Sequence, residues 1–430
     1  MIAPLKVAVA GLGTVGAGTL RILSTHSELL AERSRRPLQV TAVSARDKSR
    51  DRGIDISAIE WFDDPAEMAD KADCDLVVEL IGGSDGIAKE TCERAIAAGR
   101  HVVTANKALV AVHGKDLANA AEEAGVALAF EAAVAGGIPI VKALREGLTG
   151  NQVSRVHGIL NGTCNYILTA MRESGRAFDD VLAEAQSLGY AEADPSFDVD
   201  GVDAAHKLAI LASLAFGCDV NFEGVHVEGI RSISAEDIAY ASELGYRIKL
   251  LGIAERTENG IRQRVHPAMV PLNAPIASIE GVLNGVAVEG DFVGPTMLQG
   301  AGAGAGPTAS AVVADIVDVA CGRISPVFGI AAKALKSLPS AQMESHSGSF
   351  FVRMMVYDRP GVLADIAAAL RDHEISIESV IQRTRSATEA VPVVLTVHET
   401  SERAMSAAMK KIAALDAIQV PMQLIRIERT

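Results

Sequence analysis

The chain has 430 residues, of which 49% are hydrophobic and 22% are charged. That length predicts more than one domain, and that composition is typical of folded cores and excludes a disordered chain. The net charge of −14 argues against a surface for nucleic acid or for an anionic membrane. With no signal peptide, no long apolar run and scattered cysteines, we expect a soluble protein of the reducing cytoplasm.

The stretch of residues 1–136 alternates apolar runs with alanine-rich helical runs. The predicted strands are "KVAVAG", "LQVTAVS", "CDLVVELIGG", "HVVTANK" and "VALAFEAAV". Apolar strands separated by helices are typical of a parallel sheet that is covered on both faces. We therefore predict an α/β protein that begins with a Rossmann-type dinucleotide-binding domain, completed by a helical return over residues 302–330.

The motif "GLGTVG" follows the first predicted strand directly and opens a helix. Gly11 permits the tight turn, Gly13 lets the backbone approach a pyrophosphate, and Gly16 permits close packing of helix on strand. Thr14 and Val15 begin the helix, whose N-terminus attracts phosphates. The motif predicts a dinucleotide site, and the alternative is an ordinary glycine-rich turn.

Charged residues follow the second predicted strand in "VSARDKSRDR". Arg46 is placed to bind the 2′-phosphate of NADP, since a guanidinium matches phosphate geometry. Asp47 leaves NAD open, and a solvated charged loop is a third possibility. Thr104 and Lys107 lie at the end of "HVVTANK", at the sheet edge where ligands collect. Both are candidates for cofactor contact, although Lys107 can equally be a surface lysine.

The region 137–301 is predicted to be an α+β substrate-binding and dimerisation domain, and it contains "YAEADPSFDVDGVDAAHKLAIL". Asp203 and Lys207 lie four residues apart in a helical run, so they can pair on one face. A lysine among carboxylates keeps its proton, which suits a donor to a developing alkoxide. A routine ion pair on a solvated surface explains the same pattern, and the residues alone leave both interpretations open.

Cysteine and histidine chemistry looks less promising. Cys164 lies beside polar residues in "NGTCNYIL", but no base for a covalent mechanism is identifiable, so we interpret it as structural. The histidines show no spacing typical of a zinc site.

The C-terminal part divides into two pieces. Residues 337–349, "SLPSAQMESHSGS", are small and polar and predict a linker. Residues 350–430 follow the order β-α-β-β-α-β, which is the pattern of a ferredoxin-like unit.

Taken together, the motifs resemble homoserine dehydrogenase with a C-terminal ACT domain. The matching stretches occur in family order along nearly the whole chain, and they are "GLGTVG", "ELIGG", "VTANKALVA", "FEAAVAGGIPI", "LNGTCNYIL", "LGYAEADPSFDVDGVDAAHKLAIL", "GAGAGAGPTASAVVADI" and "FFVRMMVYDRPGVLADIA". The resemblance implies that NAD or NADP serves the interconversion of L-aspartate 4-semialdehyde and L-homoserine, on the route to threonine, isoleucine and methionine.

The resemblance also implies roles for single residues. Lys207 is expected to protonate the substrate oxygen, with Asp203 as its partner and as a substrate contact. Glu192 is expected to bind the substrate, and Lys107 to contact cofactor and substrate. Gly302 is expected to touch the cofactor.

A monovalent-cation loop is implied as well. Its ligands for Na+ would be a carboxylate and backbone carbonyls, which are hard oxygen donors. The residues concerned are Glu131, Val134, Gly136 and Ile138.

The ACT domain implies feedback inhibition by threonine, with Asp358 and Gly361 at the turn that would hold the effector; the alternative is a dimerisation module without a ligand. We expect a homodimer or homotetramer. Two rival functions remain at this stage: another amino-acid semialdehyde dehydrogenase, and a non-catalytic sensor of nucleotide and amino acid.

Overall fold

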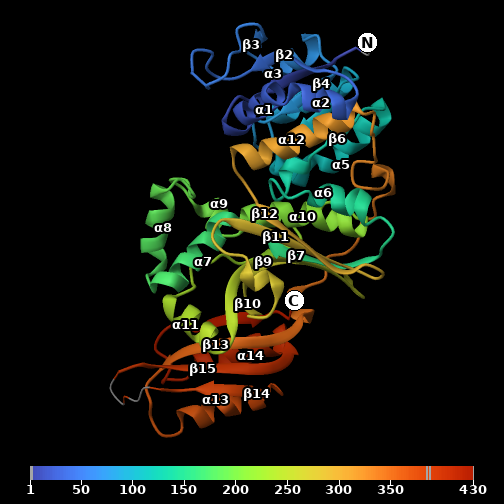
Figure 1. The fold of residues 1–430 in the computed structure, drawn as a ribbon. Coiled ribbons are helices and arrows are strands. Elements are labelled where there is room, and N and C mark those ends of the chain that lie inside the picture. The colour runs from blue at the N-terminus through green and yellow to red at the C-terminus, as the bar shows by residue number, and fades with distance from the viewer. Residues whose placement is uncertain (1–2, 384–385, 387–388, 430) are drawn as a thin grey trace.

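Two β-sheets organise the computed structural model, which describes residues 3–383, 386 and 389–429. Figure 1 shows three lobes in a row, with the N-terminal lobe in blue at the top and the C-terminal lobe in red at the bottom. Within the described ranges, the helices are all too short or too polar to cross a membrane.

The N-terminal lobe contains a parallel sheet of six strands in the order β3-β2-β1-β4-β5-β6. The strands are β1 (Leu5–Ala10), β2 (Leu38–Ser44), β3 (Glu60–Phe62), β4 (Leu76–Glu79), β5 (His101–Thr104) and β6 (Leu128–Ala129). The chain runs outward in opposite directions from β1 and from β4, so a crevice opens between their carboxyl ends. The predicted Rossmann-type fold is confirmed.

Helices cover both faces of this sheet. They are α1 (Thr14–Thr25), α2 (Ser27–Ser34), α3 (Pro65–Lys71), α4 (Ile87–Ala97), α5 (Lys107–Ala124) and α12 (Ala305–Ala320). Helix α12, orange in Figure 1, is the predicted helical return and packs on α1. A Cβ on Gly18 would lie 2.6 Å from the Ala305 carbonyl oxygen, so the glycine permits this close contact.

The second sheet runs through the middle and C-terminal lobes in the order β12-β11-β7-β9-β10-β16-β13-β15-β14, with β8 on β10. The strands of the middle lobe are β7 (Val153–Ile159), β8 (Val225–Val227), β9 (Tyr246–Thr257), β10 (Gly260–Pro271), β11 (Leu283–Gly290) and β12 (Gly294–Ala301). Its helices are α6 (Ile140–Lys142), which continues as a π-helical turn (Ala143–Gly147), α7 (Gly162–Ser174), α8 (Phe178–Ser187), α9 (Ser196–Val199), α10 (Val202–Phe216) and α11 (Ala235–Glu243). Short 3₁₀ helices cover Glu131–Ala133, Pro275–Ser278, Ala332–Ala334 and Met343–Ser345.

Helix α10 is the central element of the molecule. It contacts α5 in the N-terminal lobe and both β7 and β9 in the middle lobe. Nearly all its side chains are buried, as expected for a helix that is apolar around most of its circumference. Polar side chains on α10 are therefore expected to bind partners inside the protein, as Asp203, Lys207 and Ser213 do.

The C-terminal lobe has the predicted β-α-β-β-α-β order. Its elements are β13 (Ser347–Val356), α13 (Val362–Arg371), β14 (Ile377–Ile381), β15 (Val391–Ser401), α14 (Glu402–Ala413) and β16 (Gln423–Ile427). Strand β16 also pairs in parallel with β10, with Arg426 beside Ala268. The preceding segment lies along β10 too, since Ile261 N donates to Pro339 O at 2.9 Å. The middle and C-terminal lobes thus share one sheet.

Charged residues fill the junction between these two lobes. Arg264, 1% exposed, donates to Glu255 at 2.7 Å and to Glu428 at 3.0 Å. His266 is fully buried beside them, with Nε2 at 3.6 Å from Glu428. Burial and the positive charge of Arg426 lower the pKa of His266 to about 3, although the Glu428 charge acts in the opposite direction. The junction is therefore built around a neutral histidine.

This neutral histidine predicts a loss of stability in acid. The unfolded chain protonates His266 near its ordinary pKa of 6.5, whereas the folded chain does so only near 3. The contribution is complete above pH 6.5 and falls by about 1.4 kcal/mol per pH unit as pH drops below it. Calorimetric melting of wild type and His266→Asn between pH 8 and 5 should show a shallower decline in the variant. Parallel curves would contradict the assignment.

Candidate active site

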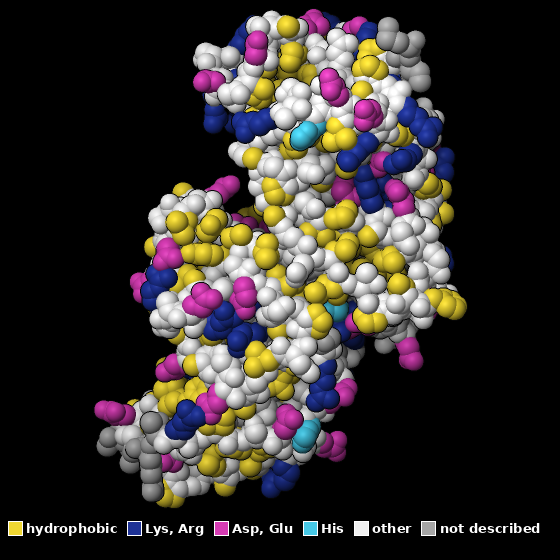
Figure 2. All heavy atoms as spheres, in the orientation of Figure 1, with side chains coloured by type: hydrophobic (Ala, Val, Ile, Leu, Met, Phe, Trp, Pro, Cys, Tyr) yellow, Lys and Arg dark blue, Asp and Glu magenta, His cyan; other side chains and the backbone are white. Residues whose placement is uncertain are grey.

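A cavity of about 260 Å³ lies at the carboxyl edge of the parallel sheet, where α10 and α12 approach it. Figure 2 shows a notch on this side, between the N-terminal lobe and the lobe that carries α8 and α9. Five residues singled out from the sequence line the cavity together: Val15, Lys107, Gly136, Lys207 and Gly302. Candidate cofactor, substrate and cation residues therefore converge at one place.

The glycine motif has the geometry that its sequence predicts. Gly11 has φ +99°, and a Cβ there would lie 2.6 Å from the Leu80 carbonyl oxygen. A Cβ on Gly16 would lie 2.0 Å from the Gly11 carbonyl oxygen. Gly13, directly before α1, has nothing within 4 Å of such a Cβ, so the backbone there is open to a ligand. The loop fits a pyrophosphate at the N-terminus of α1, where Thr14 and Val15 lie.

A buried carboxylate holds the neighbouring loops in place. Glu79 Oε1 accepts hydrogen bonds from the backbone N–H groups of Ile81 and Gly82 at 2.7 and 3.0 Å. Its Oε2 accepts from the Thr104 hydroxyl at 2.6 Å, and Thr104 Oγ1 accepts from Asn106 N at 3.0 Å. Thr104 is thus directed at the scaffold. Glu79 is not among the residues predicted from the sequence, although a carboxylate at the end of the buried strand in "ELIGG" indicates a structural or functional role.

The basic residues of the loop after β2 differ in their exposure and in their contacts. Arg46 is exposed, whereas Arg52 Nε donates to the Leu12 carbonyl within the glycine motif at 3.2 Å. Lys48 and Arg52 lie 5.7 and 5.8 Å from the centre of the Trp61 ring. Arg52 therefore binds this loop to the glycine motif, while Arg46 stays exposed at the start of the loop. Arg52 is not among the residues predicted from the sequence.

One carboxylate lies between the two lysines that line the cavity. Asp203 Oδ1 is 2.9 Å from Lys107 Nζ, and Asp203 Oδ2 is 2.7 Å from Lys207 Nζ. Lys207 also donates to the Leu160 carbonyl at 2.7 Å. Asp203 and Lys207 are only 4% and 8% exposed. The interpretation of a solvated surface ion pair is therefore wrong, because α10 carries both residues into the interior.

These charges maintain one another. Burial alone would raise the pKa of Asp203, but the ammonium groups of Lys207 and Lys107 outweigh it and lower that pKa. Burial likewise acts to lower the pKa of Lys107, and the negative charge of Asp203 more than reverses this. The result is a carboxylate that stays ionised in the interior, with a cation on each side.

Asn161 joins this group to the preceding loop. Its Nδ2 donates to Asp203 Oδ2 at 2.9 Å and to Asp198 Oδ1 at 2.7 Å, and its Oδ1 accepts from Cys164 N at 2.8 Å, which caps α7. Burial raises the pKa of Asp198, and the nearby Asp203 charge acts in the same direction. One amide thus separates two carboxylates that would otherwise repel each other. Asn161 is not among the site residues predicted from the sequence.

The other acidic residues of the loop have different surroundings. Glu192 is exposed, and its charge is one of the causes that raise the pKa of Lys107. Asp194 accepts from Ser196 N at 3.1 Å, and Asp200 pairs with Arg231. These contacts give Asp194 and Asp200 local structural roles that the sequence had left open.

Cys164 is fully buried, and burial raises its pKa well above its ordinary value. Its Sγ lies 3.2 Å from the Asp198 carbonyl. Such a thiol is a poor nucleophile, which supports the interpretation of Cys164 as structural.

The candidate cation loop follows β6. Glu131 is 2% exposed, and its carboxylate accepts from Val141 N and Lys142 N at 2.9 and 2.8 Å. Burial, and then the charge of Asp315, raise its pKa to about 7. A Cβ on Gly136, which has φ +53°, would lie 2.4 Å from the Gly302 carbonyl oxygen. Nowhere in the described ranges do three or more His, Cys, Asp or Glu side chains form a group able to hold a metal ion.

The Val134–Ile138 turn offers carbonyl groups to the same loop. Ile138 O already accepts a hydrogen bond from Ile140 N at 2.8 Å. Since a carbonyl oxygen has two lone pairs, this hydrogen bond leaves Ile138 O able to serve as a cation ligand beside the carbonyls of Val134 and Gly136.

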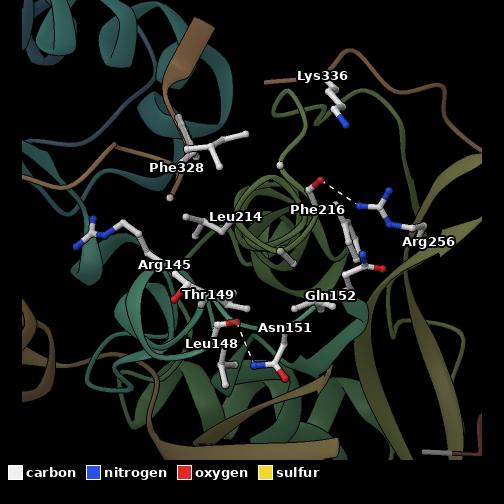
Figure 3. Close-up of a pocket in the computed structure, with 16 residues that line it drawn as sticks. Arg145, Leu148, Thr149, Asn151, Gln152, Leu214, Phe216, Arg256, Phe328 and Lys336 are labelled. Carbon is white, nitrogen blue, oxygen red and sulfur yellow. Dashed lines mark hydrogen bonds between the residues drawn. The ribbon is translucent and has the colours of Figure 1, made fainter. Parts of the chain in front are cut away.

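A larger cavity of about 500 Å³ lies near the C-terminal end of α10. Figure 3 shows Arg256 and Lys336 on one side of it and Arg145 on the other, with Arg256 donating to the Phe216 carbonyl. We place the chemistry at the smaller cavity, because Lys107 and Lys207 line it and the buried Asp203 carboxylate joins these two lysines.

Comparison with known proteins shows the family to which the chain belongs. The family model described as "Homoserine dehydrogenase" matches residues 139–317, and "Homoserine dehydrogenase, NAD binding domain" matches residues 11–131. The model described as "ACT domain" matches residues 350–417.

The curated homoserine dehydrogenase of Pseudomonas aeruginosa is 47% identical to this chain, over 99% of both. The chain belongs to the homoserine dehydrogenase family. A homoserine dehydrogenase crystal structure from Thiobacillus denitrificans is 48% identical, with a TM-score of 0.93, and the match covers 99% of this chain and 98% of that one. A hyperthermophilic archaeal homoserine dehydrogenase solved in complex with NADPH is 28% identical, with a TM-score of 0.63, over 73% of this chain and 97% of that one. Membership of the homoserine dehydrogenase family makes the protein an NAD(P)-dependent oxidoreductase that acts on a CH–OH group.

Asn161→Asp tests the geometry of the site in this homoserine dehydrogenase. The new carboxylate still caps α7 but replaces a donor with a third negative charge beside Asp198 and Asp203. Loss of a hydrogen bond to a charged group costs about 1.5–3 kcal/mol, so kcat/KM for homoserine should fall by roughly ten- to a hundredfold. Asn161→Ser, which keeps a cap and one donor, is the control and should lose less. Equal losses in both variants would count against the donor role.

Proposed function

We propose that the chain interconverts L-homoserine and L-aspartate 4-semialdehyde with NADP as its main cofactor, using Lys207 as the acid–base group. The observation that carries the proposal is the buried Asp203 carboxylate between Lys107 and Lys207 on the wall of the cavity. Cavity, glycine loop and lysine pair lie together at the sheet edge where dinucleotide enzymes bind their ligands.

Lys207 is suited to handle the proton of the substrate. In the reducing direction its ammonium group donates a proton to the oxygen of the aldehyde, and in the oxidising direction the neutral amine takes it back. The bound nicotinamide supplies or accepts the hydride. Asp203 and the Leu160 carbonyl hold Nζ of Lys207 in position.

The substrate's own charges find complements nearby. Lys107, with 33% of its side chain exposed, is the more open of the two lysines and can contact substrate and cofactor. Glu192 lies on the loop before α9 and Asp198 lies on α9, and their negative charges suit the ammonium group of an amino acid. We assign substrate binding to these three residues and to Asp203.

The loop after β2 supports NADP. Arg46 is exposed beyond the end of β2, on the loop that Arg52 holds against the glycine motif. A free guanidinium there suits a 2′-phosphate. Gly11, Gly13 and Gly16 would hold the pyrophosphate, and Gly302 lines the same cavity.

Two regulatory features complete the proposal. Na+ would bind at the turn after β6, to Glu131 and to the carbonyls of Val134, Gly136 and Ile138, and a cation there would stabilise the buried carboxylate. Threonine would bind the ACT domain at the turn before α13, where Gly361 has φ +100°.

Lys207→Ala tests the acid–base role. The variant should lose about 10²–10⁴-fold in kcat for homoserine oxidation, because general acid–base catalysis contributes that much. NADPH affinity, measured by fluorescence titration, should stay within about twofold. Cys164→Ser is the matched control and should remain active; its inactivity would favour a covalent mechanism. Cofactor binding without turnover in wild type would favour a sensor.

Arg46→Ser tests the cofactor. Its kcat/KM for NADP+ should fall by about tenfold or more, since a charged hydrogen bond to phosphate is lost. The value for NAD+ should be unchanged. Arg50→Ser, which removes an exposed cation from the same loop, is the control. If it lowers NADP+ use equally, the overall charge of the loop, and not Arg46, sets the preference.

A further inference from the structure

One arginine of the ACT domain reaches across to the middle lobe. Arg426 on β16 is 5% exposed. Its two terminal nitrogens donate to the two carboxylate oxygens of Glu228 at 2.9 Å each, and it also donates to Glu402 at the start of α14. Such a bidentate pair fixes the position and the orientation of Glu228. Glu228 lies directly after β8, in the segment 228–231.

That segment lies against α9, which carries part of the active-site loop. Ile230 N donates to the Val199 carbonyl at 2.9 Å. A Cβ on Gly229 would lie 2.4 Å from the same Val199 oxygen, so the two backbones are in direct contact. Arg231 pairs with Asp200 and donates to Ser196 at 3.1 Å. A shift of residues 228–231 must therefore move α9.

Helix α9 in turn sets the position of Asp198. This carboxylate is bound by Asn161, and Asn161 also holds Asp203, which contacts both lysines. The path from Arg426 to Asp203 runs through an ion pair, the backbone of residues 228–230, the Ile230–Val199 hydrogen bond and the two hydrogen bonds of Asn161.

The segment is packed at Ile230, which is fully buried, and is more open at Glu228 and Arg231. A cavity of about 470 Å³ lies beside it, and Asp200, Glu228, Arg231 and Arg426 line this cavity together with residues of β16. The open space gives the segment room to move when a contact is lost. Without Arg426, Glu228 keeps only its contact with His226 Nε2 at 2.7 Å among the side-chain contacts of the described residues, so its carboxylate can turn away from β16.

We propose that Arg426 and Glu228 are positioning residues for the dehydrogenase reaction. The last strand of the ACT domain holds residues 228–231 against α9 and so fixes the place of Asp198 at the substrate's ammonium group. The inference rests on the proposed function, since it takes Asp198 as a substrate contact. Through this contact, the ACT domain contributes to substrate binding even when no effector is bound.

The test compares two arginines that join the same two lobes. Arg426→Met removes the pair with Glu228. Arg353→Met removes another bidentate pair, with a more deeply buried carboxylate: Arg353 donates to Asp237 of α11 at 2.6 and 3.1 Å, on the side away from α9. Glu228→Gln keeps the shape of the side chain and serves if Arg426→Met folds poorly. Steady-state kinetics, NADPH titration and melting are measured for each.

For Arg426→Met and Glu228→Gln we expect KM for homoserine to rise by about tenfold, with kcat and NADPH affinity within about twofold. Arg353→Met should melt lower but keep the wild-type KM. Combining Arg426→Met with Asn161→Asp should give a loss smaller than the product of the single effects, because both act through Asp198. An unchanged KM, or an equal rise in Arg353→Met, would overturn the inference. Wild type without homoserine oxidation would instead refute the proposed function.

Discussion

A single buried carboxylate decides how this molecule is put together around its site. Asp203 enters the interior on α10, and its ionised form persists there because Lys107 comes from the N-terminal lobe and Lys207 from its own helix. Breaking either contact would leave a charge in a poorly solvated place. The two lobes are therefore joined by an electrostatic contact at the very point where the cavity opens, so docking of the lobes and assembly of the site are one event.

The scaffold around this carboxylate relies on groups that satisfy backbone atoms. Glu79 orders the turn after β4, and Glu131 caps the start of α6. Asn161 binds both backbone and side chains: its oxygen caps α7, and its Nδ2 donates to two carboxylates. The loops that face the cavity are thus held by side chains from inside the protein, and they need little contribution from a ligand to keep their shape.

The features predictable from sequence are those that depend on local spacing. The turn at Gly11–Gly16 and the order of elements in the ACT domain follow from residues near one another in the chain. Spacing also paired Asp203 with Lys207, but it could not decide whether that face of α10 is buried, because burial depends on strands far along the chain. The roles of Asn161 and Arg426 could not be predicted for the same reason. The side chains that they bind lie tens of residues away, and no local sequence pattern indicates such a contact.

The sheet shared by the middle and C-terminal lobes has a consequence for how the chain tolerates shortening. Strand β10 gives backbone partners to β16 at Ala268 and Met269. A chain cut before the ACT domain would leave that stretch as an open edge, with unpaired N–H and C=O groups flanked by apolar side chains. Such edges recruit other strands and promote aggregation. By pairing with β10, the ACT domain therefore also protects the middle lobe from aggregation with other copies of the chain.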